Sequence, residues 1–287
     1  MTKSTSDLAL FGGEKFIKTN FSTYNSIGQE ELDAAAEVIK SGVLSGFIGR
    51  GGEAFLGGEK VRAFEKACED YFDVKYAISV NSWTSGLIVA VGALDINPGD
   101  EIIVPPWTMC ASATAILHWN AIPVFADIDP ETFCISPSSI EANISPQTKA
   151  IMSVDIGGHP SNSEAINKIA ASNGLKVISD TAQSPGAFYK GKMAGTLSDI
   201  GGYSFNYHKH VHTGEGGMLV TDDARLAERM RLIRNHAEAV VGDIEMNDIA
   251  NMLGFNFRLG EIEAVIGLEQ LKKLQSVFSG NAHVQTA

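Results

Sequence analysis

Short apolar segments alternate with longer segments of helical periodicity between about residues 60 and 240. Apolar runs of this kind, bounded by turn residues, are typical of buried strands, and the longer segments are typical of helices that cover a sheet. The alternation predicts an α/β fold with a mostly parallel central sheet flanked by helices. The predicted strands are Tyr76–Val80, Glu101–Val104, Ile122–Ala126, Ala150–Val154, Lys176–Ser179, Ile200–Ser204 and Met218–Val220. The predicted helices are Gly58–Tyr71, Ser85–Leu94, Ala111–His118, Ser163–Asn173 and Ala224–His236.

The pattern divides the chain into three parts. Residues 1–58 form an N-terminal segment whose glycine-rich stretch, Gly46 to Gly58, lacks the Gly-Lys-Ser/Thr ending of a P-loop. We interpret that stretch as a flexible loop and a candidate substrate lid. Residues 59–240 are expected to form the large domain, and residues 241–287 to begin a small C-terminal domain with a turn and an amphipathic helix between Leu253 and Leu274.

Composition narrows the class of protein. The chain has 287 residues, of which 44% are hydrophobic, so it can bury a large core. Its net charge of −12 argues against a nucleic acid or an anionic membrane as partner, because both need clustered Lys and Arg. The first seven residues contain no apolar signal core. Three cysteines, Cys68, Cys110 and Cys134, lie on apolar stretches and are interpreted as reduced core thiols of a cytoplasmic protein.

Lys209 is the first candidate for chemistry. It follows the apolar run Ile200–Phe205 and precedes the glycine cluster Gly214–Gly217. A lysine held on such a loop can form an imine with a carbonyl compound, whereas the alternative is a surface lysine in a hairpin. Ser204, five residues earlier, is placed to reach a phosphate.

Three other predicted strands end in groups that suit a ligand, and ligands of open α/β sheets bind at the carboxyl ends of the strands. Thr84 and Ser85 open a helix and suit a phosphate, although either could simply cap that helix. Trp107 and Met109 could cover a planar ring, although both residue types are more often core. Asp180 needs a positive partner such as a protonated ring nitrogen, unless it caps the following turn.

An anchored phosphate, a ring cover, a carboxylate and a lysine are together the parts of a pyridoxal phosphate site. In order and spacing the chain resembles the DegT/DnrJ/EryC1/StrS family of pyridoxal phosphate-dependent sugar aminotransferases, which have the aspartate aminotransferase fold (fold type I). The matching stretches are residues 99–105, 123–129, 179–187, 204–209, 214–217 and 254–262.

The resemblance implies a role for each matching residue. Lys209 would be the Schiff-base lysine, Asp180 would pair with the ring nitrogen, and Gln183 would lie against the phenolic oxygen of the cofactor. The residues that would hold the phosphate are Thr84, Ser85 and Ser204. Asn256 and Arg258 match a segment that reaches the neighbouring subunit's cofactor phosphate in the family's dimers. The resemblance therefore implies a homodimer with shared active sites.

The chain departs from the family pattern in four ways. Trp83 stands where the family commonly has glycine, and the ring-stacking aromatic position falls on Met109, two residues after Trp107. Residues Asp155–Gly158 replace a His-Leu-Tyr-Gly stretch. Family members also continue beyond the last matching helix, so most of the small domain is expected to be missing.

The leading hypothesis is transfer of an amino group from glutamate or glutamine to a keto group of a nucleotide-linked sugar or a cyclitol, in amino sugar or polysaccharide biosynthesis. One alternative is a sugar dehydratase, but members with that activity have histidine in place of the lysine, so Lys209 favours transamination. Another is a non-catalytic regulator that binds the cofactor or a sugar. No metal is expected, because His208, His210 and His212 alternate without a cysteine or carboxylate at ligand spacing.

Overall fold

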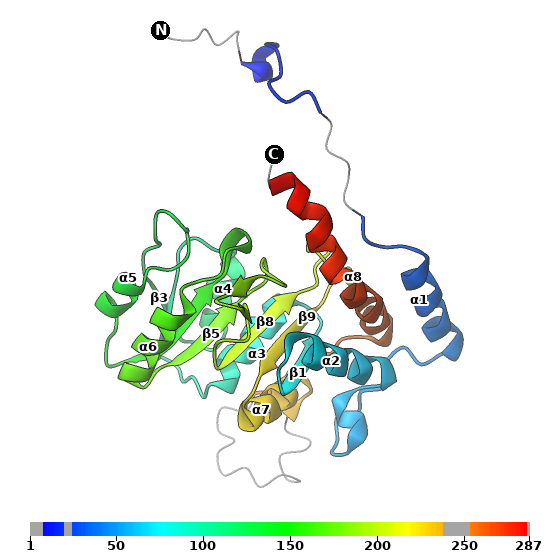
Figure 1. The fold of residues 1–287 in the computed structure, drawn as a ribbon. Helices are drawn as coiled ribbons and strands as arrows, with labels where there is room; N and C mark the ends of the chain where they lie inside the picture. Colours follow the sequence, from blue (N-terminus) through cyan, green and yellow to red (C-terminus); the bar gives the residue numbers. More distant parts are fainter. Residues whose placement is uncertain (1–7, 20–24, 238–252, 286–287) are drawn as a thin grey trace.

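The computed structural model describes residues 8–19, 25–237 and 253–285, with side chains up to residue 277. Its centre is a seven-stranded sheet in the order β1-β9-β8-β5-β4-β2-β3 (Figure 1). Strand β9 is antiparallel to both of its neighbours, and the remaining pairings are parallel. The strands are β1 (Tyr76–Val80), β2 (Glu101–Val104), β3 (Ile122–Phe125), β4 (Thr148–Val154), β5 (Lys176–Asp180), β8 (Ile200–Ser204) and β9 (Gly217–Thr221). The predicted mostly parallel α/β sheet is therefore confirmed, with every strand end within two residues of its predicted position.

Helices cover both faces of this sheet. The helices are α1 (Gln29–Ser41), α2 (Glu59–Phe72), α3 (Trp83–Ala93), α4 (Cys110–His118), α5 (Pro137–Ala142), α6 (Ser163–Asn173), α7 (Ala224–Arg234) and α8 (Glu261–Gln285). The short elements are the 3-10 turns η2 (Ala9–Phe11), η3 (Glu53–Leu56) and η4 (Ile156–Gly158) and the hairpin of β6 (Phe188–Tyr189) and β7 (Lys192–Met193). Helices α1 and α5 and this hairpin were not predicted. None of the described helices is both long and apolar enough to cross a membrane.

Alternation along the strands sends side chains to two faces. Ile102 and Val104 of β2 belong to the core under α3, α4 and α7, whereas Ile103 between them belongs to the core under α5 and α6. In the same way Ile78 of β1 faces α3 and α7, and Ala77 faces α2 and α8. This period of two is the expected property of a strand buried on both sides.

Helix α8 caps helix α2. The Glu261 carboxylate accepts hydrogen bonds from the backbone N–H groups of Lys60 (2.9 Å) and Val61 (3.3 Å), which lie in the first turn of α2 and have no partner within that helix. Gly58 precedes α2, and a Cβ atom on it would lie only 2.5 Å from the carboxyl carbon of Glu261. Glycine at position 58 therefore makes room for the capping carboxylate.

A second contact joins α8 to α1. Glu31 is buried and accepts hydrogen bonds from Gln270 Nε2 and Lys273 Nζ, both at 2.8 Å. Burial alone would raise the pKa of Glu31, but the hydrogen bonds from Lys273, from Gln270 and from the Gly28 N–H outweigh burial and lower that pKa to about 2. Glu31 is therefore ionised and fixes the N-terminal helix to α8.

The glycine-rich stretch from Gly46 to Gly58 is bonded at two points to the residue that follows α7, and its role as a substrate lid stays a prediction. The Asn235 side chain donates hydrogen bonds to the backbone oxygens of Ile48 (3.2 Å) and Phe55 (3.1 Å), and Phe55 is buried in the core. These contacts anchor the stretch to the end of α7.

The predictions for the three cysteines and for the domain boundary can be compared with the structure. Cys68 and Cys134 are buried, as expected, but Cys110 is exposed because it occupies the first turn of α4 rather than a core position. The expected domain boundary at residue 240 lies outside the described residues, which end at 237 and resume at 253.

Candidate active site

Asp180 is the last residue of β5 and is 4% exposed. Both oxygens of its carboxylate have donors: Trp83 Nε1 lies 2.7 Å from Oδ1, and Ser112 Oγ lies 2.8 Å from Oδ2. The backbone N–H of Ala182 also donates to Oδ1, at 3.2 Å. Asp180 therefore does more than cap the following turn, because side chains from α3 and α4 hold its carboxylate.

The electrostatics of Asp180 follow from this environment. Burial raises the pKa of its carboxyl group, while the hydrogen bonds from Ser112, Trp83 and Ala182 and the charge of Lys209 act in the opposite direction. The charge of Lys209 thus acts on Asp180 from nearby, and the pairing of Asp180 with a ring nitrogen stays a prediction. The sequence did not predict the hydrogen bonds that the uncharged groups of Trp83, Ser112 and Ala182 donate to Asp180.

Lys209 is half-buried in the loop between β8 and β9. Its backbone N–H donates to Asn206 O at 2.9 Å, and Thr213 N–H donates to Phe205 O at 3.0 Å, so the loop is closed at its base. Burial lowers the pKa of the Lys209 amine, and the charge of Asp180 partly offsets that effect. The loop backbone around Lys209 is therefore held by hydrogen bonds, and its half-buried amine gives up its proton more readily than that of a surface lysine.

The first turn of α3 is capped by Ser82. Its Oγ accepts a hydrogen bond from the Ser85 N–H at 3.1 Å and lies 2.9 Å from Ser85 Oγ. The alternative prediction that Thr84 or Ser85 is the N-cap is therefore wrong, because the helix begins two residues earlier than expected. Thr84 is exposed on this turn, where the helix dipole favours an anion. The phosphate-binding roles of Thr84, Ser85 and Ser204 stay predictions.

Two other predicted residues have partners within the chain. Gln183 Oε1 accepts a hydrogen bond from the Gly157 N–H at 2.8 Å, which joins the loop after β5 to the turn after β4. Arg258 Nη1 donates to Asn235 Oδ1 at 3.1 Å. The segment containing Asn256 runs beside the end of β1, since the Asn81 N–H donates to Phe257 O at 2.9 Å. The reach of Asn256 and Arg258 to another subunit stays a prediction.

Trp107 and Met109 are exposed by 58% and 65% respectively. The alternative that they are core residues is therefore wrong. Met109 occupies the N-cap position of α4, and the Trp107 ring centroid lies 6.4 Å from that of Phe133. Coverage of a cofactor ring by Trp107 or Met109 stays a prediction.

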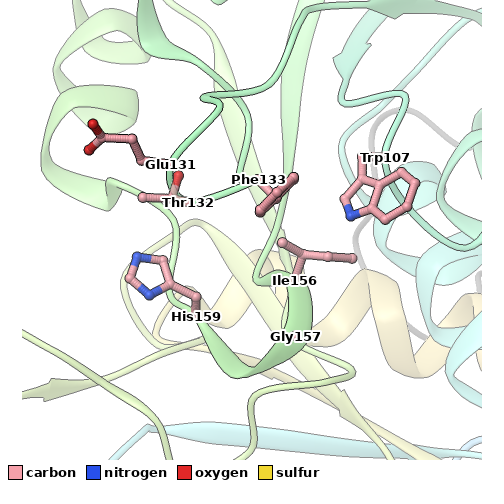
Figure 2. A pocket seen from close by; sticks show the side chains of 7 residues that line it. All are labelled: Trp107, Glu131, Thr132, Phe133, Ile156, Gly157 and His159. Carbon is pink, nitrogen blue, oxygen red and sulfur yellow. The ribbon is translucent and has the colours of Figure 1, made fainter. Parts of the chain in front are cut away.

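A cavity of about 360 Å³ opens beside Trp107. Figure 2 shows polar side chains at one side of it, Trp107 at the other, and Phe133 and Ile156 between them. Its lining residues are Trp107, Glu131, Thr132, Phe133, Ile156, Gly157 and His159. Gly157 has a φ of +60° and a Cβ there would meet nothing within 4 Å, so the missing side chain leaves this space open. The cavity borders the candidate site, because Gly157 also binds Gln183.

Sequence reasoning missed two polar residues near Asp180. Ser112 carries no motif, and it reaches Asp180 only because α4 packs beside α3. Asp155 directly follows β4, is buried, and accepts hydrogen bonds from Ser161 N–H and Thr181 Oγ1, both at 2.8 Å. Burial raises the pKa of Asp155. The position of Asp155 at a strand end was the available signal.

Comparison with known proteins identifies the relatives of the chain. The family model described as the DegT/DnrJ/EryC1/StrS aminotransferase family matches residues 26–286. The spore coat polysaccharide biosynthesis protein SpsC of Bacillus subtilis is 37% identical, with 88% of this chain and 63% of that protein covered. GDP-perosamine synthase of Caulobacter vibrioides is 40% identical, with 79% of this chain and 60% of that protein covered. The chain thus spans about three-fifths of the length of these curated relatives.

The solved structures similar to this chain include an aminotransferase and a sugar dehydratase. An aminotransferase from Psychrobacter cryohalolentis has a TM-score of 0.79 at 35% identity, over 90% of this chain and 65% of that chain. An Escherichia coli GDP-4-keto-6-deoxy-D-mannose-3-dehydratase, solved with bound hydrated pyridoxal phosphate, has a TM-score of 0.77 at 29% identity, over 91% of this chain and 70% of that one.

Proposed function

Because the chain belongs to the DegT/DnrJ/EryC1/StrS aminotransferase family, we propose that it binds pyridoxal phosphate and transfers an amino group from glutamate or glutamine to a keto group of a nucleotide-linked sugar or a cyclitol. The observation that carries the proposal is that a half-buried amine, Lys209, follows β8 and the buried carboxylate of Asp180 ends the neighbouring strand β5, where the two charges act on each other. An amine and a carboxylate are two of the four parts that a pyridoxal phosphate site needs from a protein.

The residues present fit the cofactor. Lys209 supplies an amine of lowered pKa, and the first turn of α3 offers N–H groups and the Thr84 hydroxyl to a phosphate. A carboxylate has about four acceptor positions, and three donors occupy Asp180, which leaves one acceptor position on Oδ2 for a ring N–H. Gln183, in the loop after β5, would lie against the phenolic oxygen of the cofactor.

Each protein group has a distinct task in this proposal. Bound pyridoxal phosphate supplies a carbonyl that condenses with amines and a ring that withdraws electrons from the carbon next to the bound nitrogen. Lys209 Nζ would hold the cofactor between turnovers, and as a free amine it would serve as the base that takes the proton from the donor's α-carbon and as the acid that gives it back. Asp180 keeps the ring nitrogen protonated, because a buried carboxylate favours a positive partner.

The cavity beside Trp107 supports a sugar as amino acceptor. It has two aromatic side chains for the apolar face of a sugar ring and polar side chains, including Glu131 and His159, for hydroxyl groups. No Lys or Arg is among its described lining residues, so a diphosphate would bind elsewhere. A keto-sugar dehydratase is among the structural relatives, but lysine rather than histidine at position 209 favours amino transfer.

We also propose that two chains pair to complete the site, with Asn256 and Arg258 facing the partner's cofactor phosphate. Exposed apolar side chains on α4 and β3, namely Leu117 (55%), Ile122 (48%) and Phe125 (53%), support an interface on this part of the surface. Light scattering that finds a monomer with fully bound cofactor would contradict this.

The test of the function is the visible absorption spectrum of the purified chain with pyridoxal phosphate, before and after addition of glutamate. We expect a visible band that Lys209→Ala abolishes and that glutamate bleaches in the unmodified protein. Lys190→Ala is the matched control, since Lys190 is an exposed lysine of the β6–β7 hairpin paired with Glu164. A band that persists in Lys209→Ala, or that glutamate leaves unchanged, would refute the proposal.

A further inference from the structure

We propose that Trp83 is a positioning residue for Asp180, whose indole N–H holds the carboxylate and ties it to the helix turn that carries Thr84 and Ser85. The bond is the 2.7 Å contact from Trp83 Nε1 to Asp180 Oδ1. Trp83 is the first residue of α3, so one side chain joins the phosphate end of the candidate site to its ring-nitrogen end. The inference rests on the proposed function, because it assigns Asp180 to a cofactor ring.

Three glycines make room for Trp83. A Cβ atom on Gly202 of β8 would overlap the indole ring, and one on Gly86 would lie 2.6 Å from it. A Cβ on Gly217 of β9 would lie 2.9 Å from the Trp83 backbone. Trp83 is 5% exposed, so its ring is packed on these sides and has little freedom to rotate. A donor held this rigidly fixes the orientation of the group that it binds.

The hydrogen bonds predict which carboxylate oxygen faces the cofactor. Oδ1 accepts from both Trp83 and the Ala182 N–H, and Oδ2 accepts from Ser112. Ser112 Oγ in turn lies 2.8 Å from Thr108 Oγ1, which limits its own rotation. Since each oxygen has about two acceptor positions, Oδ2 alone keeps one for a ring N–H.

Loss of the indole N–H has a consequence that depends on pH. The charged groups that face Asp180 are Lys209, which favours the ionised carboxylate, and Asp155, which is coupled to it through repulsion. The Trp83 hydrogen bond also favours the ionised form, so its removal raises the pKa of Asp180. Trp83→Phe is therefore expected to lose bound cofactor on acidification at a higher pH than the unmodified protein.

The bond itself is testable without cofactor, from the indole N–H resonances of the three tryptophans in ¹⁵N-labelled protein. Trp119 is the matched control, because it is also 5% exposed and its Nε1 donates to a backbone oxygen, that of Ile88, at 2.8 Å. We expect the Trp83 and Trp119 signals to exchange slowly with solvent and the signal of exposed Trp107 to exchange fast. Asp180→Asn should move the Trp83 signal and leave that of Trp119 in place. A Trp83 signal that exchanges as fast as that of Trp107 would overturn the proposal, even if Asp180→Asn does not fold.

Cofactor binding gives the second readout. A carboxylate that has lost its positioning donor pairs less well with the ring N–H, so Trp83→Phe should bind pyridoxal phosphate roughly tenfold more weakly, which is the size of one hydrogen bond to a charged group. Trp119→Phe removes an equal ring and an equal N–H and should bind it as the unmodified protein does. If Trp83→Phe and Trp119→Phe bound the cofactor equally well and lost it at the same pH on acidification, that result would contradict the positioning role of Trp83. If the unmodified protein bound no cofactor, the proposed function would fail, while the exchange and Asp180→Asn results would still decide whether the bond exists.

Discussion

Burial acts in opposite directions on the two ionisable groups at the centre of the site. It raises the pKa of Asp180 and lowers the pKa of Lys209, so both neutral forms are favoured relative to groups in water. The two charges oppose this effect by stabilising each other. For Lys209 the net result is an amine that gives up its proton more readily than a surface lysine, which is the form that attacks a carbonyl.

The lowered pKa of Lys209 predicts a specific order of reactivity. Only the neutral amine reacts with an acylating reagent, and a lower pKa makes that form available at lower pH. In competitive labelling across a pH series, Lys209 should therefore reach half-maximal reactivity at a lower pH than Lys190, whose pKa is raised by its hydrogen bond and charge interaction with Glu164. Peptide mass spectrometry measures both lysines in one sample. A Lys209 profile at or above that of Lys190 would contradict the electrostatic account of the site.

The residues of the site differ in how far sequence predicts them. Asp180 and Lys209 were predictable because Asp180 ends one recognisable apolar strand, Lys209 follows another, and parallel strands bring their carboxyl ends to one edge. The bonds from Trp83 and Ser112 to Asp180 were not, because they depend on how α3 and α4 pack on the sheet. Side-chain direction across three elements has no signature in one sequence.

At the scale of elements, the contact of α8 with the start of α2 is specific enough to test. Glu261→Ala removes a capping carboxylate and should lower the free energy of unfolding by about 1–2 kcal/mol. Gly58→Ala forces a methyl group against the same carboxylate and should cost about 1–3 kcal/mol. Because both changes disturb one contact, Gly58→Ala should cost less in the Glu261→Ala background. Urea unfolding of the two single variants and of the double variant measures these free-energy costs.

Gly49→Ala is the control for this series, since a Cβ at Gly49 would meet nothing within 4 Å, and it should change stability by less than about 0.5 kcal/mol. Strictly additive costs for Gly58→Ala and Glu261→Ala would show that the two residues act independently and that the carboxylate is not the reason for the glycine.

Helix α1 shows why some elements escaped prediction. Its buried face contains the charged Glu31 beside Val38, while Leu32 and Ile39 are 61% and 60% exposed. Leu32 and Ile39 therefore do not mark the face that packs, so the apolar pattern of this segment does not indicate how the helix contacts the rest of the chain. Helix α5 escaped for a different reason, because its six residues are too few to establish a helical period.

At the scale of the whole molecule, strand order is what creates the site. Strand β5 lies beside β8, which places Asp180 next to the loop that carries Lys209, although 28 intervening residues include a separate hairpin. Alternating strands and helices predicted a mostly parallel sheet, but not this order, because order depends on which helices pack on which face. The chain spans about three-fifths of its curated relatives, and the predicted cofactor contacts Lys209, Asp180 and Gln183 lie within it.

The proposed function depends on the capture of pyridoxal phosphate by Lys209. The most direct test is to incubate the purified protein with pyridoxal phosphate, reduce it with borohydride, and map the modified peptide by mass spectrometry. We expect one stoichiometric adduct, at Lys209, and its loss in Lys209→Ala. Absence of an adduct, or an adduct distributed over exposed lysines such as Lys190 and Lys272 with Lys209 unmodified, would contradict it.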